Sequence, residues 1–342
     1  MQKKPSLKDF AKELNISVPT VSRALKNHPD IGKDLKLKVW ELAKKYNYPI
    51  KETNGNTKES GTKTIGVIVP NVERNFYASI ISGVENYAKK EGYFLIMVSS
   101  RENYRTEVEC IDNLLKLKVD GLIVCLSQET IDNEHFNKAR KKNVPLVFFD
   151  RVCRTQEFSS VVADNTEAAK TITQHLISSG SKHVAHIAGP QLLSITKERI
   201  AGYLKALEEN DLTLNNNHLV YCDLSANGAQ KAINKLLDAP EVPDAVFCVN
   251  DTVAYVAMKE VKKRGYKIPE DIAITGFNDE FHSTLVEPAL TTILHPTFEM
   301  GQETARLLLS QIASNYPHSP RQIVMKTQLV VRDSSVKKRN ND

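Results

Sequence analysis

Residues 16–25 read Ile16-Ser-Val-Pro-Thr-Val-Ser-Arg-Ala-Leu25. Ser17 is a good N-cap for a helix, and Pro19 falls in its first turn, where no backbone donor is lost. Apolar residues also recur at helical spacing over residues 7–14. Two short helices joined by a tight turn form a helix-turn-helix, whose second helix enters the major groove of DNA. A third helix over residues 33–46 is expected to close a small core.

Positive charge is concentrated at this end of the chain. Residues 1–60 contain 13 Lys and Arg against 7 Asp and Glu, whereas the whole 342-residue chain has a formal net charge of +5. The remainder is therefore close to neutral. A basic end on a neutral body is typical of a protein that places that end on nucleic-acid phosphates. The sequence thus predicts a DNA-binding end and a body with a different task.

From residue 63 onward, the patterns of buried strands alternate with helical patterns. The first series predicts strands at 64–70, 94–99, 121–125 and 145–150, with helices at 76–91, 104–118 and 131–142. The second series predicts strands at 183–188, 219–221, 245–249 and 271–276, with helices at 195–210, 226–238 and 251–265. This alternation predicts two doubly wound parallel α/β sheets, hence a two-lobed body.

Ligands of such folds bind beyond the carboxyl ends of the strands. The side chains there are mostly polar or aromatic. They are Asn71, Asn75-Phe76-Tyr77, Ser99-Ser100, Asp150-Arg151, Gly189, Asn250-Asp251, Asn278-Asp279 and His295. A mixture of amides, carboxylates, an Arg and aromatic rings suits a polyhydroxylated ligand held by many hydrogen bonds.

The 16–25 string, followed by His28-Pro29 and Tyr46-Asn-Tyr-Pro49, resembles the LacI/GalR family of bacterial transcription regulators. The body resembles the periplasmic-binding-protein-like core of the same family. The matching strings include Arg199-x-x-Gly-Tyr, Val249-Asn-Asp, Gly276-Phe-Asn-Asp and Pro288-Ala-Leu-Thr-Thr. The resemblance covers residues 6–332. It implies a helix-turn-helix domain followed by a two-lobed effector-binding body.

The resemblance implies two sets of site residues. The residues expected to contact DNA are Leu7, Ser17, Val18, Pro19, Thr20, Ser22, Arg23 and Lys26. Of these, the resemblance implies that Val18, Pro19 and Arg23 read bases. It implies that Ser17, Thr20 and Ser22 contact the DNA backbone. Those expected at the effector are Asn75, Phe76, Asp150, Arg199, Leu224, Asn250, Asp251, Asn278 and His295. The family usually has Asp at position 278 and Gln at position 295. The neutral Asn278 admits an anionic group that a carboxylate would repel.

Residues 1–48 are expected to form the DNA-binding domain, 49–62 a linker and 63–342 the effector-binding and dimerisation domain. Lobe 1 is expected to comprise about 63–162 and 293–321, and lobe 2 about 163–292 and 322–332. The family folds its linker into a hinge helix on DNA. Here Asn54-Gly-Asn56 replaces the expected pattern, so a weakened or absent hinge helix is predicted.

The sequence disfavours several other classes of protein. The sequence lacks phosphate-cradle and nucleophile-elbow motifs, so an enzyme is not expected. The odd, scattered cysteines indicate reduced core thiols, and no metal or cofactor is expected. No signal-peptide core or long apolar stretch appears, which favours the cytoplasm and no membrane contact. The alternatives are a solute-binding protein and an architectural DNA-binding protein with an inert body.

We therefore expect a regulator, most simply a repressor, controlled by a small polar metabolite such as a sugar or sugar derivative. A homodimer would match a palindromic operator. The C-terminal tail from residue 334 has no leucine heptads, so a tetramerising coiled coil is not expected.

Overall fold

The structure, a computed structural model, describes residues 6–25, 30–46, 61–152, 157–314 and 319–337. The chain divides into two compact units, residues 1–61 and residues 62–342. Several expectations lie outside the described residues: those on Lys26, on the strings His28-Pro29 and Asn47-Tyr-Pro49, on a hinge helix in the linker, on one of the scattered cysteines, Cys153, and on the end of the tail from residue 338.

The first unit is a bundle of three helices, α1 (Leu7–Glu13), α2 (Val18–Leu25) and α3 (Lys33–Lys45). Each helix contributes a fully buried apolar side chain to one small core, namely Phe10, Val21 and Val39. Ser17 Oγ accepts a hydrogen bond of 3.2 Å from the Thr20 N–H, which confirms Ser17 as the N-cap of α2. The predicted helix-turn-helix is therefore confirmed.

Lobe 1 is built on a six-stranded parallel sheet with the order β11-β5-β4-β3-β1-β2. Its strands are β1 (Thr64–Val69), β2 (Phe94–Ser99), β3 (Gly121–Val124), β4 (Leu146–Phe149), β5 (Ser159–Ala163) and β11 (Gln322–Met325). Its helices are α4 (Asn75–Lys90), α5 (Tyr104–Lys116), η1 (Glu134–Phe136), α6 (Asn137–Lys141) and α11 (Thr297–Ala313). One core lies between the sheet and α4 with α11, and the other between the sheet and α5 with α6.

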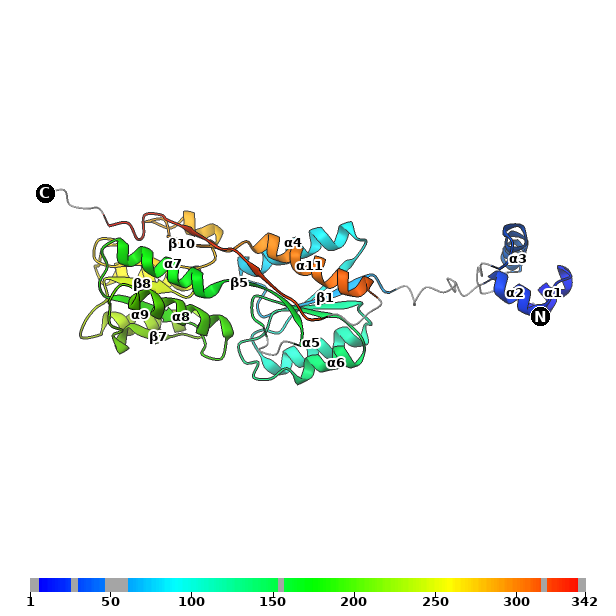
Figure 1. Ribbon diagram of the computed structural model, residues 1–342, viewed down its shortest axis with the longest axis horizontal. Coiled ribbons are helices and arrows are strands. Elements are labelled where there is room, and N and C mark those ends of the chain that lie inside the picture. The colour runs from blue at the N-terminus through cyan, green and yellow to red at the C-terminus, as the bar shows by residue number, and fades with distance from the viewer. Residues whose placement is uncertain (1–5, 26–29, 47–60, 153–156, 315–318, 338–342) are drawn as a thin grey trace. The chain divides into compact units, whose positions relative to one another are not determined.

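Lobe 2 is built on a four-stranded parallel sheet with the order β7-β6-β8-β9. Its strands are β6 (Val184–Ala188), β7 (Leu219–Tyr221), β8 (Ala245–Cys248) and β9 (Ala273–Thr275). Its helices are α7 (Asn165–Ser178), α8 (Ser194–Glu208), η2 (Asn216–His218), α9 (Ala226–Leu237), α10 (Asp251–Lys263) and η3 (Phe281–Thr284). Figure 1 shows the two sheets with their helices as separate lobes of the body.

The chain passes between the lobes three times. It leaves β5 for α7 at Asp164, returns from β10 (Thr292–Leu294) to α11, and leaves β11 for β12 (Gln328–Val330). β10 and β12 pair antiparallel as a two-stranded ribbon. Several short crossovers of this kind allow two lobes to change their separation while each sheet stays intact.

The expected lobe boundary was wrong for residues 322–325. These residues form β11, which lies beside β5 in the lobe 1 sheet rather than in lobe 2. Without β11, the backbone groups along this edge of β5 would be unpaired. Where this pairing begins, Ser160 N–H donates a hydrogen bond of 2.8 Å to the Arg321 carbonyl. The assignment to lobe 2 failed because it treated residues 322–332 as one element.

The helix expected at 131–142 was also wrong at its start. Residues 134–136 form a 3₁₀ turn, and the α-helix covers only Asn137–Lys141. The buried Glu107 carboxylate accepts hydrogen bonds from Ser127 N–H at 2.7 Å and from Thr130 Oγ1 at 2.8 Å. Glu107 also lies 2.9 Å from His135 Nε2. These bonds hold the segment as a loop, which periodicity alone does not reveal.

Helices α4 and α11 pack at very short range through glycines. A Cβ atom at Gly301 would lie 2.0 Å from the Ile80 carbonyl oxygen, and one at Gly83 would lie 2.0 Å from the Phe298 carbonyl oxygen. Backbone oxygens cannot move aside as a flexible side chain can. Glycine is therefore required at both positions for the two helices to pack on the lobe 1 sheet.

Gly301→Ala is expected to lower the free energy of unfolding of the body by about 1–3 kcal/mol, because the methyl group collides with the α4 backbone. Helix propensity alone would give the opposite sign, a gain of up to about 1 kcal/mol. Urea unfolding of the full chain measures the change. Ser82→Ala, at an exposed position on α4, is the control, and a stabilised Gly301→Ala variant would contradict the close packing.

Candidate functional site

The outer face of α2 carries short polar groups and one cation. Ser17, Pro19 and Arg23 are exposed, and Thr20 and Ser22 are half-buried. A guanidinium on such a helix can donate two parallel hydrogen bonds to a guanine edge. The arrangement fits the base contact predicted for Arg23, which stays a prediction.

Two other DNA candidates take part in the helical core. Leu7 and Val18 are half-buried and pack against the cluster that contains Phe10 and Val21. The Ser17 and Thr20 hydroxyl oxygens lie 2.7 Å apart and are hydrogen-bonded to each other. Their predicted phosphate contacts would replace or extend that bond, since each hydroxyl oxygen has further lone pairs.

The carboxyl ends of the strands in both lobes border a small central cavity of about 30 Å³. Six of the nine predicted effector residues line it, namely Phe76, Asp150, Arg199, Leu224, Asn250 and Asn278. Five further residues complete the lining, namely Arg74, Tyr77, Arg151, Ile195 and Val249. A cavity of this size holds only one or two water molecules. A sugar can enter only if the lobes move apart.

Arg199 is the buried cation of the central cavity. Its Nε and Nη2 donate to Asn165 Oδ1 at 3.0 and 2.9 Å, and its Nη1 donates to the Val249 carbonyl at 2.5 Å. The guanidinium carbon lies 3.7 Å from the centre of the Phe277 ring. Burial lowers the pKa of Arg199 to about 10, which leaves it charged at neutral pH. These contacts use three of its five N–H groups and leave two for a ligand.

Asp150 contributes the carboxylate of the central cavity and is 4% exposed. Burial raises the pKa of Asp150, and the nearby Arg151 and Arg199 act in the opposite direction. Cys125 Sγ lies 3.9 Å from Asp150 Oδ2 and is a weak donor. The carboxylate can therefore accept stronger hydrogen bonds from ligand hydroxyl groups.

Three lining residues have left-handed backbone conformations. The φ angles are 56° at Asp150, 64° at Leu224 and 119° at Asn278. Such conformations are costly for residues other than glycine and cluster at binding sites. Asn250 is also constrained, because its Oδ1 accepts a hydrogen bond of 2.9 Å from Val253 N–H at the start of α10. The side chains are thus aimed by their backbone before any ligand binds.

Three predicted residues lie outside the central cavity. Asn75 is exposed and lines a different, wider cavity of about 730 Å³ between the lobes. Asp251 is fully buried and accepts hydrogen bonds from Thr292 Oγ1 at 2.6 Å and Glu280 N–H at 2.7 Å. It stabilises the turn after β9, which is a structural task.

His295 stands behind the cavity wall. It is 2% exposed and packs edge-on against Phe76, with 5.2 Å between ring centroids. Burial, and to a smaller extent Arg199, lower its pKa to about 3. The imidazole is therefore neutral, and it sets the position of the Phe76 ring that lines the cavity.

Arg74 was missed by the sequence analysis, which had no signal for it. Its Nη2 donates to the Leu224 carbonyl at 3.1 Å, a hydrogen bond that joins lobe 1 to lobe 2 across the cavity. Arg74 also lowers the pKa of Glu280 in lobe 2, although burial raises that pKa overall. Arg74 therefore stabilises the arrangement in which the lobes are close together.

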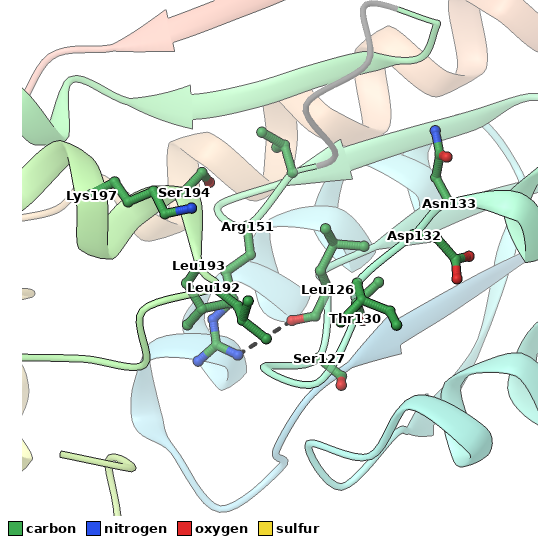
Figure 2. A pocket seen from close by; sticks show the side chains of 12 residues that line it. Leu126, Ser127, Thr130, Asp132, Asn133, Arg151, Leu192, Leu193, Ser194 and Lys197 are labelled. Atoms are coloured by element: carbon green, nitrogen blue, oxygen red, sulfur yellow. Dashed lines mark hydrogen bonds between the residues drawn. The ribbon is translucent and has the colours of Figure 1, made fainter. Parts of the chain in front are cut away.

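A second cavity of about 250 Å³, named here the side pocket, also lies between the lobes. Lobe 1 contributes Leu126, Ser127, Thr130, Ile131, Asp132, Asn133, Arg151 and Val152, and lobe 2 contributes Leu192, Leu193, Ser194 and Lys197. Figure 2 shows these side chains and the hydrogen bond from Arg151 to the Leu126 carbonyl. Arg151 lines both the side pocket and the central cavity.

Within the described parts of the chain, no group of His, Cys, Asp and Glu is arranged to hold a metal ion. Among the same residues, no helix is both long enough and apolar enough to span a membrane. The cavities between the lobes are lined by many groups that can donate or accept hydrogen bonds.

Comparison with known proteins agrees with both parts of the structure. Residues 6–49 match the family model described as bacterial regulatory proteins, lacI family. Residues 62–332 match the model described as periplasmic binding proteins and sugar binding domain of LacI family. The first match lies within the first compact unit, and the second begins at residue 62, where the second unit begins.

Individual relatives extend over nearly the whole chain. The HTH-type transcriptional repressor CytR of Escherichia coli (strain K12) is 30% identical over 330 residues, which is 96% of each chain. Catabolite control protein A of Priestia megaterium is 31% identical over 301 residues, 88% of this chain and 90% of that one. A solved structure of the transcriptional regulator CelR with cellobiose is 28% identical, covers 96% of this chain and 99% of its own, and has a TM-score of 0.75.

In this chain a helix-turn-helix unit is followed by a two-lobed body with a polar cavity between its lobes, and each part matches a family model of LacI proteins. The chain belongs to the LacI family of bacterial transcription regulators.

Proposed function

We propose that this protein is a cytoplasmic transcriptional repressor whose affinity for its operator is set by a small polar metabolite bound in the central cavity. The observation that carries the proposal is the presence of Arg199 and Asp150 in the lining of one cavity, in a chain that also has a helix-turn-helix. A guanidinium and a carboxylate at one site can bind adjacent hydroxyl groups of a sugar as donor and acceptor.

The relatives support this class of effector. The similar regulator CelR was solved with cellobiose, and a LacI family regulator from Enterococcus faecium, 25% identical with a TM-score of 0.71, was solved with ribose. In this chain Leu224, Ile195 and Phe76 add apolar surface to the polar groups of the cavity. This combination suits the mixed polar and apolar faces of a sugar ring.

Regulation would follow from the separation of the lobes. The central cavity of about 30 Å³ is too small for a sugar, so a bound effector favours a different lobe arrangement from the one described. The Arg74 to Leu224 hydrogen bond opposes that change. An effector that prefers one arrangement shifts the equilibrium by the difference between its affinities for the two arrangements.

We further propose a homodimer on a palindromic operator, because a two-fold protein dimer matches two half-sites about one helical turn apart. Apolar side chains on β2, the edge strand of the lobe 1 sheet, suit a second copy of the chain. Phe94 and Met97 are 77% and 46% exposed. If both DNA-binding domains must bind together, a change in the spacing between them reduces affinity without altering any DNA contact.

Arg23→Ala is expected to reduce the preference for operator over scrambled DNA by about 1–3 kcal/mol, because the base-reading guanidinium is lost. Fluorescence anisotropy with an operator selected from random oligonucleotides measures the preference. Lys12→Ala, an exposed position on α1, is the matched control and should reduce affinity for both DNAs alike. An Arg23→Ala variant with unchanged selectivity would show that α2 does not read bases as proposed.

Asp150→Asn is expected to weaken binding of a responsive sugar roughly tenfold or more, because a charged acceptor is replaced by a neutral amide. Folding and sugar-free operator binding should be retained, since burial already disfavours the Asp150 charge. Calorimetry gives sugar affinity, with a sugar chosen for its effect on operator binding. Asp112→Asn, whose partner is Lys138 on the surface of lobe 1, is the control. Equal sugar affinity in both variants would place the ligand elsewhere.

A further inference from the structure

We propose that the side pocket binds the anionic group of a phosphorylated effector, whose polyhydroxylated part occupies the central cavity. This inference rests on the proposed function and narrows its ligand from polar metabolites in general to sugar phosphates. The two cavities share Arg151. A single ligand can therefore place its sugar in one cavity and its phosphate in the other.

The side pocket has room for such a group. Its volume of about 250 Å³ is several times that of the central cavity, so it admits a phosphate together with water. Both lobes contribute to it, through Arg151 from lobe 1 and Lys197 from lobe 2. An anion bound between two cations on different lobes would link effector binding to lobe arrangement.

Arg151 is a buried cation with hydrogen-bonding capacity left over. It is 2% exposed, and its Nη1 donates to Glu102 Oε2 at 2.7 Å and to the Leu126 carbonyl at 3.3 Å. Its Nε is buried and has no hydrogen-bond partner in the described chain. An unsatisfied donor on a buried cation is costly, and a ligand oxygen at this guanidinium would reduce that cost.

The lobe 2 wall of the pocket is the N-terminus of α8, a helix of 15 residues. Leu193 occupies the N-cap position and provides no side-chain cap, and the first turn carries no acidic residue. Ser194 is the first helical residue and lines the pocket. Uncapped N–H groups and the helix dipole both favour an anion at this position.

Lys197 adds a full positive charge one turn further along α8. It is exposed, and it makes no ion pair with another residue that the structure describes. By contrast, the other cation of the pocket, Arg151, already forms an ion pair with Glu102, in which Nη1 and Oε2 lie 2.7 Å apart. Lys197 and the α8 N-terminus are therefore the positive groups of the pocket that a ligand anion can neutralise.

The acidic groups nearby do not oppose an anion strongly. Asp132, which lines the pocket, accepts hydrogen bonds from Tyr104 O–H at 3.2 Å and from Glu134 N–H at 3.0 Å. In the central cavity, the lining residue Asn278 carries a neutral amide, which does not repel an anion. Among the described residues that line the central cavity, Asp150 is the one with a carboxylate, and Arg199 lines the same cavity.

The test uses the full chain and inorganic phosphate as the probe, with calorimetry at constant ionic strength and sodium acetate as the comparison anion. Phosphate is expected to bind at millimolar concentrations or tighter, and acetate more weakly, because a phosphate dianion accepts more hydrogen bonds at higher charge. Lys197→Gln should weaken phosphate binding roughly tenfold. Lys205→Gln, exposed near the other end of α8, should leave phosphate binding unchanged.

A second pair of variants guards against misfolding. Ser194→Asp places a negative charge at the first position of α8, where an acidic residue stabilises a helix. It should therefore keep or raise Tm while weakening phosphate binding more than the neutral Ser194→Asn does. Phosphate affinity that is insensitive to Lys197→Gln and to Ser194→Asp overturns the proposal, as does an acetate affinity equal to that of phosphate.

The outcomes separate this inference from the proposed function. Glucose 6-phosphate and glucose, compared in the same titrations and in operator binding, provide the distinction. Operator binding that responds to a neutral sugar, with no phosphate binding at the side pocket, retains the proposed function and rejects the phosphate site. Phosphate binding that depends on Lys197, in a chain that binds no DNA, retains the site and rejects the proposed function.

Discussion

The effector cleft depends on the hydrogen bonds that hold the Arg199 guanidinium. Asn165 begins α7 directly after the chain crosses from β5, and Val249 follows β8, so these bonds tie a crossover to the end of the lobe 2 sheet. A buried guanidinium requires such partners, because an unpaired charge in this position would be strongly destabilising. Arg199 and Asp150 of lobe 1 both line the central cavity. One side chain thus fixes the cleft wall and offers hydrogen bonds to a ligand.

The arrangement of the lobes around this group is stabilised by Arg74, which joins lobe 1 to the Leu224 carbonyl of lobe 2. The strained backbone at Asp150, Leu224 and Asn278 is maintained by the sheets that precede these turns. A ligand therefore meets side chains that are already oriented and has to change mainly the distance between the lobes. That distance is the property through which a ligand can influence the DNA-binding domains.

Sequence patterns predicted the helix-turn-helix, the four strands of the lobe 2 sheet and four of the six strands of the lobe 1 sheet, because strand and helix periods are local properties. They did not predict β5 or β11. The expectation that ligands bind beyond the carboxyl ends of the strands also placed Phe76, Asp150 and Asn250 at one cavity, whereas Arg199, inside α8, was named only through the family resemblance. It could not distinguish Asp251, whose carboxylate turns inward to Thr292, from its neighbour Asn250. The place of β11 depends on pairing with a strand about 160 residues earlier, and Arg74 acts through a backbone carbonyl of the other lobe. Neither long-range contact leaves a signal in one sequence.

The central claim is that effector binding changes the separation of the lobes. Spin labels at Glu109→Cys in lobe 1 and Lys205→Cys in lobe 2 would report it, since both positions are exposed and the described native cysteines are buried. Cys153, outside the described residues, is replaced by serine. Pulsed electron–electron distance measurements are then made with a sugar or sugar phosphate that alters operator affinity. The account predicts a shifted interlobe distance distribution on binding. A compound that alters operator affinity while this distribution stays the same would contradict it.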